Sequence, residues 1–170
     1  MLLMMSGKII KTIPFNTKKS IKRATAIKRA RKGSAIEAEG KIYYWSSNME
    51  RINIIRDCIP YRSIEIISKR LNRPIKSVLA MVGMPQTTYN KKIGENSLLD
   101  SRISELIVLT TELLDFGVEV FDNDEEKFQR WLKKPNLSLG GISPESLLDT
   151  TTGIDEVKFA LNRIEFGNLA

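Results

Sequence analysis

The sequence contains no histidine and only one cysteine, Cys58, in 170 residues. It therefore cannot supply a Ser-His-Asp triad, a Cys-His pair or an ordinary set of zinc ligands, and one cysteine cannot form an internal disulfide. No apolar run approaches the roughly 18 residues that cross a bilayer, and Met1 to Met5 is too short for a signal-peptide core. We expect a soluble, cytoplasmic protein that is not an enzyme and that uses no cofactor, metal site or membrane.

Charge is unevenly distributed along the chain. Residues 1–94 contain 20 Lys and Arg against 5 Asp and Glu, a balance of +15. Residues 95–170 contain 7 against 15, a balance of −8, which gives the overall +7. A basic first part suits a polyanion such as nucleic acid, whereas the acidic second part would be repelled by it. The two parts therefore predict two different partners.

Residues 8–32 form a basic stretch with few large apolar side chains. It cannot bury much surface by itself. Two interpretations follow from the same electrostatics: a solvated tail, or an arm that lies along the DNA backbone.

Helical spacing of apolar residues predicts an all-α protein. Ser47 and Glu50 have the Ser-x-x-Glu spacing of a capping box and open a helix that Pro60 ends. A second helix is expected to begin at Ser63, whose side chain can cap it. Lys41–Trp45 is the only candidate strand.

The segment from Pro74 to Ile93 predicts a helix-turn-helix. Apolar residues at helical spacing lead to Gly83, whose backbone freedom permits a tight exit, and Pro85 suits the start of the next helix. On that helix, Tyr89 and Ile93 lie four residues apart and are expected to face inward. The other side chains are polar or cationic and suit base edges and phosphates: Gln86, Thr87, Thr88, Asn90, Lys91 and Lys92.

From Leu99 to Phe121 a long amphipathic helix carries a wide apolar stripe. We expect most of the stripe to lie in the core, and part of it could be a dimer seam, because symmetric helix-turn-helix proteins usually bind DNA as two copies. Acidic residues follow where a helix start favours them and without calcium-loop spacing: Asp122, Asp124, Glu125 and Glu126.

The last part of the chain predicts three further helices. One contains Phe128 and Trp131, with Trp131 expected in the core. Gly140-Gly141 is read as a turn, because it lacks the Lys and Ser/Thr of a phosphate-binding loop. After it, we expect a short helix that ends at Gly153 and a last helix from Asp155 to Phe166.

Several motifs in this part resemble, in order and spacing, the C-terminal toxin-binding domain of the Xre/MbcA/ParS antitoxin family. They are Phe128-Gln129-Arg130-Trp131-Leu132, Pro135-Asn136, Leu139-Gly140-Gly141-Ile142-Ser143-Pro144, Leu147-Leu148-Asp149-Thr150, Gly153, Val157 and Arg163-Ile164-Glu165-Phe166-Gly167. Ahead of them, Gly83 to Lys92, Leu98 and Ser101-Arg102 look like the Xre-type helix-turn-helix of the same family. The resemblance covers roughly Ser63 to Ala170.

The resemblance implies an Xre-like helix-turn-helix domain followed by a small helical toxin-binding domain. We divide the chain accordingly into a basic arm (1–46), a DNA-binding and dimerisation domain (47–121) and a toxin-binding domain (122–170). The implied function is that of an antitoxin in a type II toxin–antitoxin system. Such a protein binds a RES-domain toxin, which consumes NAD or uses it for ADP-ribosylation, and represses its own operon by binding operator DNA as a homodimer.

In that family the C-terminal segment approaches the NAD pocket of the toxin. This role carries over to the toxin-binding residues Arg163, Glu165, Phe166, Gly167, Asn168, Leu169 and Ala170. A pocket that holds a pyrophosphate should be electropositive, so an acidic domain that ends in a carboxylate could occupy it. Arg163 departs from this charge argument and could instead pair with a toxin carboxylate.

Two other functions remain open from the sequence. The first is a stand-alone dimeric repressor whose acidic domain only dimerises. The second is a basic RNA-binding protein, against which the lack of Gly/Arg-rich repeats and single-strand stacking motifs counts. Because Lys cannot make the bidentate guanine contact of Arg, we expect Lys91 and Lys92 to position phosphates, and Gln86, Thr88 and Asn90 to read base edges.

Overall fold

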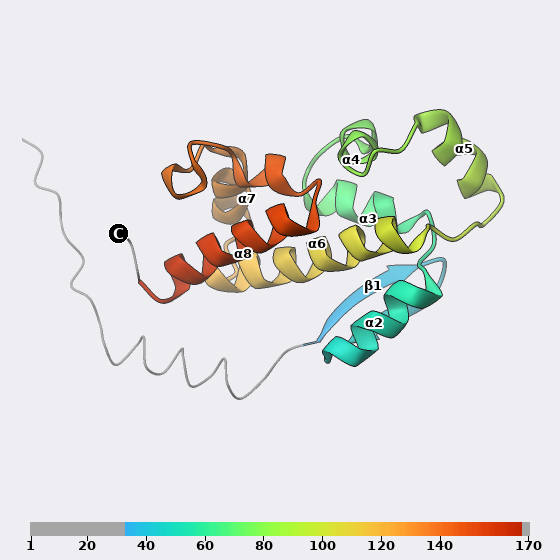
Figure 1. The fold of residues 1–170 in the computed structure, drawn as a ribbon, viewed down its shortest axis with the longest axis horizontal. Helices are drawn as coiled ribbons and strands as arrows, with labels where there is room; N and C mark the ends of the chain where they lie inside the picture. Colours follow the sequence, from blue (N-terminus) through green and yellow to red (C-terminus); the bar gives the residue numbers. More distant parts are fainter. Residues whose placement is uncertain (1–32, 168–170) are drawn as a thin grey trace, which may run out of the picture. The chain divides into compact units, whose positions relative to one another are not determined.

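The computed structural model describes residues 33–167, which belong to one compact unit (Figure 1). Helices dominate it, as the sequence predicts, and a two-stranded sheet precedes them. The elements are β1 (Ser34–Ala38), β2 (Lys41–Trp45), α2 (Asn48–Asp57), α3 (Ser63–Arg70), α4 (Ile75–Met81), α5 (Gln86–Gly94), α6 (Ser101–Val120), α7 (Glu125–Lys133), the 3-10 turns η1 (Leu137–Leu139) and η2 (Pro144–Leu147), and α8 (Thr151–Glu165). Within these residues no helix is long and apolar enough to cross a membrane.

Strands β1 and β2 form an antiparallel hairpin in which Ala38 pairs with Lys41 and Ser34 with Trp45. Both turn residues, Glu39 and Gly40, have positive φ, the geometry that matches the twist of tight hairpins. Alternate residues of β1 are buried against α3 and α6. The candidate strand Lys41–Trp45 is therefore confirmed, whereas its partner β1 escaped the sequence analysis, which placed both in a basic arm.

Helix α6 is the centre of the fold (Figure 1). Eleven of its twenty residues are buried, and it contacts β1, α2, α3, α7 and α8. Asp100 caps its first turn by accepting a hydrogen bond from the Ile103 backbone, 2.8 Å away. The apolar stripe is thus largely used within the chain, in agreement with its predicted place in the core.

A close approach between α6 and α7 depends on Gly117. A Cβ built on this residue would lie 2.1 Å from the Phe128 ring, so only glycine lets the ring pack there. Phe128 is buried and stacks at 6.2 Å, centroid to centroid, on the half-buried Trp131, which packs against the core as predicted. Asp124 caps α7 through the Lys127 backbone, so this acid serves a helix start, as expected.

The last helix begins earlier than the sequence suggested. Thr150 is its N-cap and accepts a hydrogen bond from the Gly153 backbone, so Gly153 lies inside α8 and does not end a helix. A Cβ at Gly153 would come within 1.9 Å of the Leu147 carbonyl oxygen. The glycine is there because η2 packs directly on the first turn of α8. Gly140 and Gly141 both have positive φ and form the turn that was predicted.

Candidate functional sites

Helices α4 and α5 are joined by a tight turn at the position where the sequence predicts a helix-turn-helix. Gly83 has φ +72°, and the backbone N–H groups of Gly83 and Met84 donate to the carbonyls of Ala80 and Leu79 at 3.1 and 2.8 Å. This pair of bonds ends a helix with a left-handed glycine. From α6, Arg102 donates to the Val82 carbonyl at 3.1 Å. The tight turn that Gly83 predicted is therefore present, and Arg102 stabilises it from α6.

Tyr89 anchors helix α5. It is the one buried residue of this helix, and its hydroxyl donates to Oε1 of Glu65 on α3 at 3.0 Å. Burial, and then the hydrogen bond to the Glu65 carboxylate, raise the pKa of the Tyr89 phenol well above its usual range. Ile93 is half-buried beside it, so the predicted inward face of α5 is confirmed.

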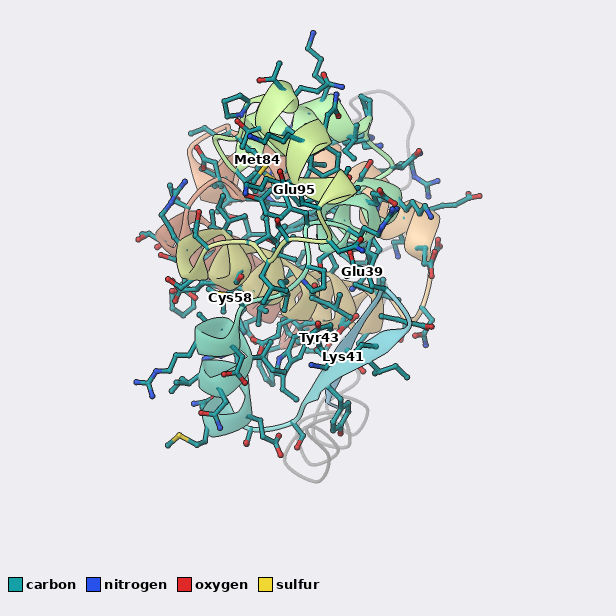
Figure 2. All side chains as sticks on the ribbon, turned by 90° about the vertical axis from the view of Figure 1, so that its right-hand side faces the viewer. Glu39, Lys41, Tyr43, Cys58, Met84 and Glu95 are labelled. Atoms are coloured by element: carbon teal, nitrogen blue, oxygen red, sulfur yellow. The ribbon has the colours of Figure 1, made fainter. Side chains whose placement is uncertain are left out.

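The rest of α5 faces solvent. Five of the six predicted DNA-contacting residues are exposed: Gln86, Thr87, Thr88, Asn90 and Lys91. Lys92 differs, because it is half-buried and its Nζ lies 3.0 Å from Oε2 of Glu95. That contact lowers the pKa of Glu95. Figure 2 labels Met84 and Glu95, which flank α5. Within the described residues, Lys91 of this helix forms no salt bridge, whereas Lys92 is already paired with Glu95.

A second exposed surface lies on the C-terminal part. Phe159 and Phe166 lie seven residues apart on the outward side of α8 and are 56% and 42% exposed. Leu137 in η1 is 95% exposed, and Ile142, which follows the Gly-Gly turn, is 47% exposed. These four residues are called the α8–η1 surface. Helix α8 and η1 are in contact, so these exposed apolar side chains lie on neighbouring elements and make a candidate interaction surface.

Arg163 connects the two parts of this surface. Its Nη2 lies 3.5 Å from the Ser138 carbonyl oxygen, a long contact that holds η1 beside α8. Glu165, like Arg163, is half-buried, and Phe166 and Gly167 are exposed. The other three predicted toxin-binding residues, 168–170, lie outside the described residues, as does the basic stretch 8–32. The sequence analysis missed Leu137, Ile142 and Phe159, although the α8 spacing of Phe159 and Phe166 could have indicated one exposed face.

The geometry of the described residues offers no metal site, since no group of three or more Cys, Asp or Glu side chains gathers in residues 33–167. What they offer are two exposed surfaces on different helices: a polar and cationic one on α5, and an apolar one on α8 and η1. Exposed polar and cationic side chains suit a polyanion, and exposed apolar side chains suit a protein partner.

Comparison with known proteins finds similarity to one family of antitoxins. Residues 117–167 match the model of the antitoxin Xre/MbcA/ParS C-terminal toxin-binding domain. The chain is also 27% identical over 123 residues to an Antitoxin Xre of Photorhabdus laumondii. This alignment covers 72% of this chain and 83% of the relative. Together these matches support an Xre/MbcA/ParS-type antitoxin.

Two further known proteins are similar to this chain. An Antitoxin Xre of Yersinia enterocolitica is 31% identical over 94 residues, 55% of this chain and 64% of the relative. A Prs ADP-ribosylating antitoxin of a Sphingobium species is 29% identical over 138 residues, 76% of this chain and 87% of the relative. Alignments of 123 and 138 residues are longer than the matched domain, so the similarity extends into the helices that precede it.

The similarity supports an antitoxin of a toxin–antitoxin system, and the relatives are named antitoxins, which is consistent with a protein that is not an enzyme. The α8–η1 surface lies entirely within the matched toxin-binding domain. Helix α5 lies outside it. The matched domain therefore implies a toxin partner.

Proposed function

We propose that this antitoxin neutralises a RES-domain toxin that acts on NAD, by covering its active site, and that it represses its own operon. The toxin-binding part of this proposal rests on the position of the α8–η1 surface near the end of α8. Residues Phe166 and Gly167 close that helix, and the predicted plug, residues 168–170, follows directly. The apolar surface would hold the toxin while the last residues enter its pocket.

Charge supports the same arrangement. Residues 122–170 contain 9 Asp and Glu against 6 Lys and Arg. An electropositive pocket for a pyrophosphate attracts such a domain. Arg163, held near the Ser138 carbonyl at 3.5 Å, remains half-exposed and can pair with an acid at the rim of that pocket.

A truncation tests the toxin half. The full chain and a version that stops after Gly167 are mixed with a RES-domain enzyme of the same host, and both retention and NAD consumption are measured. We expect both proteins to retain the enzyme and only the full chain to inhibit it. If neither version binds the enzyme while both bind operator DNA, the stand-alone repressor is the better account.

The DNA half rests on α5 and on the charge of the first part of the chain. The helix exposes Gln86, Thr88 and Asn90 beside Lys91, on a chain whose first 94 residues have a balance of +15. A homodimer would place two such helices in successive major grooves. We also propose that residues 8–32 follow the DNA backbone. Deleting them should then flatten the slope of log operator affinity against log salt by about 0.9 for each phosphate that they neutralise. An unchanged slope would assign them to a solvated tail.

A further inference from the structure

One ion pair joins the matched toxin-binding domain to the segment that leads into α4. Arg73 lies two residues before α4, and its Nε and Nη2 donate to the two carboxylate oxygens of Glu145 in η2, the second at 3.1 Å. Glu145 lies inside the matched residues 117–167, whereas Arg73 precedes them. Two parallel hydrogen bonds along one edge of a guanidinium fix its direction as well as its position. Glu145 therefore sets the direction of the Arg73 guanidinium.

The backbone of Arg73 is held as well. Its N–H donates to the Ser68 carbonyl at 3.0 Å, and its own carbonyl accepts from the Ser68 hydroxyl at 2.6 Å. The side chain of Arg73 nevertheless stays 46% exposed, whereas that of Glu145 is 10% exposed. Because the pair uses Nε and Nη2, the donors of Nη1 remain, and they make no hydrogen bond within the described residues. The guanidinium is thus fixed along one edge and free at Nη1.

A cavity of about 350 Å³ lies beside this pair, between α4 and η2. Its lining includes Arg73, Glu145 and the exposed Asp149. Lys69 and Lys76, each within four positions of Arg73, are exposed and form no salt bridge in the part of the chain that the structure describes. Three cations therefore stand against two acids here, so the surroundings of the free Nη1 can attract an anion.

The position of Arg73 indicates which anion this is. In a helix-turn-helix the first helix crosses the DNA backbone while the second lies in the major groove. Helix α4 is the first of the two helices for which we propose operator binding, and Arg73 leads into it. We propose that Arg73 binds an operator phosphate through Nη1 and that Glu145, from the toxin-binding domain, positions it. The inference rests on the proposed DNA function and adds to α5 a contact that depends on the other half of the chain.

Arg73 should keep Glu145 while it binds the phosphate. If it left Glu145, a carboxylate that is only 10% exposed would lose its salt-bridge partner within the described residues. A buried charge without a partner is strongly destabilising, so an exchange of partners is disfavoured. Neutralising Glu145 should therefore weaken operator binding. Charge alone predicts the opposite, because an acid near the phosphates repels them.

This difference in sign gives the first test, which is made on the full chain with operator DNA at one salt concentration. Glu145→Gln should lower operator affinity about tenfold, the size of one charge-assisted hydrogen bond. Asp149→Asn is the matched control, because it removes the same charge from the lining of the same cavity and breaks no salt bridge within the described residues. Its operator affinity should equal or exceed that of wild type. Glu145→Gln that binds operator as tightly as wild type, or more tightly, would overturn the inference.

Substitutions of Arg73 separate its charge from its direction. Arg73→Lys keeps a cation but cannot form the two parallel bonds to Glu145, so it should lose affinity to a similar extent while the slope of log affinity against log salt stays near that of wild type. Arg73→Met removes the cation, and the slope should flatten by about 0.9. Arg73→Lys with wild-type affinity would show that direction is irrelevant, and an unchanged slope in Arg73→Met would show that Arg73 meets no phosphate.

A purely structural ion pair is distinguished by measuring urea unfolding and toxin inhibition on the same samples. Both should show Glu145→Gln folded and inhibitory under the conditions of the DNA assay, because the α8–η1 surface is intact. A loss of operator affinity no larger than the unfolded fraction explains would make the pair structural only. If wild type binds operator and Glu145→Gln binds it equally well, the inference alone is wrong. If wild type binds no operator, the proposed DNA function is wrong as well.

Discussion

The hydroxyl of Tyr89 and the carboxylate of Glu65 join helix α5 to helix α3 through a hydrogen bond of 3.0 Å. Glu65 in turn lies 3.7 Å from Arg62, which lies 3.8 Å from Glu39 in the hairpin turn. Because Tyr89 is the only buried residue of α5, this chain of polar contacts sets the orientation of the helix that we propose for DNA. The hairpin, which precedes α4 and α5 in sequence, is thereby linked to α5 through Arg62 and Glu65.

The Tyr89→Phe variant tests this arrangement. It keeps the ring in the core and removes the hydrogen bond, so we expect the free energy of unfolding in urea to fall by about 1 kcal/mol. Operator affinity should fall as well, because α5 is less firmly oriented, while toxin inhibition stays unchanged. A variant that binds operator like wild type would show that ring packing alone orients the helix.

The raised pKa of Tyr89 predicts a dependence on alkaline pH. A folded-state pKa above the unfolded value of about 10 means that the folded chain holds the phenol proton more tightly. This contribution to stability is complete below about pH 10 and is lost as the pH rises through and above that value. The difference in unfolding free energy between wild type and Tyr89→Phe should therefore shrink above about pH 10 and stay constant between about pH 7 and 9.

Lys91 and Lys92 should differ in their effect on DNA binding. Lys91→Met removes a free cation, so the slope of log affinity against log salt should flatten by about 0.9, and binding should weaken alike for all operator sequences. The double variant Lys92→Met/Glu95→Gln removes an ion pair of 3.0 Å and no net charge, so its slope should stay near that of wild type. A slope loss as large as that of Lys91→Met would show that Lys92 leaves Glu95 to bind a phosphate. A change of base preference at one position by Lys91→Met would make Lys91 a base reader.

Local signals allowed part of this fold to be predicted. The capping box of Ser47 and Glu50, the left-handed exit at Gly83 and the inward spacing of Tyr89 and Ile93 each involve residues within four positions of one another. The ion pair of Lys92 with Glu95 is equally local and was available from the sequence. These features are determined by residues that lie close together in the sequence.

Other features depend on contacts between distant residues, and the sequence misled or was silent there. Strand β1 has only one large apolar residue, Ile36, and becomes a strand because it pairs with β2 and packs on α6. Gly153 by itself suggests the end of a helix, but it lies inside α8. A glycine is needed there because the Leu147 carbonyl packs against it. Ser63, expected to cap α3, is instead its first residue and is buried. No local pattern contains that information.

Gly153→Ala should therefore destabilise the antitoxin strongly. The added Cβ would lie 1.9 Å from a backbone oxygen that cannot rotate away, so we expect the free energy of unfolding to fall by about 3 kcal/mol from overpacking. Gly94→Ala is the control, because Gly94 is helical and nothing lies within 4 Å of the added atom. That substitution should leave stability unchanged or raise it by about 0.5 kcal/mol. Equal stability of the two variants in urea unfolding would mean that η2 does not pack on α8 in this way.

Variants of the α8–η1 surface separate effects on toxin binding from effects on folding most clearly. Leu137 is 95% exposed, so Leu137→Ser removes almost no contact within the chain and should not change the urea midpoint. If the surface binds the toxin, the same variant loses an apolar contact worth about 1–3 kcal/mol, which is roughly 10- to 100-fold in affinity. Phe159→Ser should act in the same direction, and Leu98→Ser, at a residue 51% exposed outside the matched domain, should have no effect on toxin inhibition. If toxin affinity did not change in the Leu137 and Phe159 variants but was lost when residues 168–170 were removed, residues 168–170 alone would make the contact with the toxin.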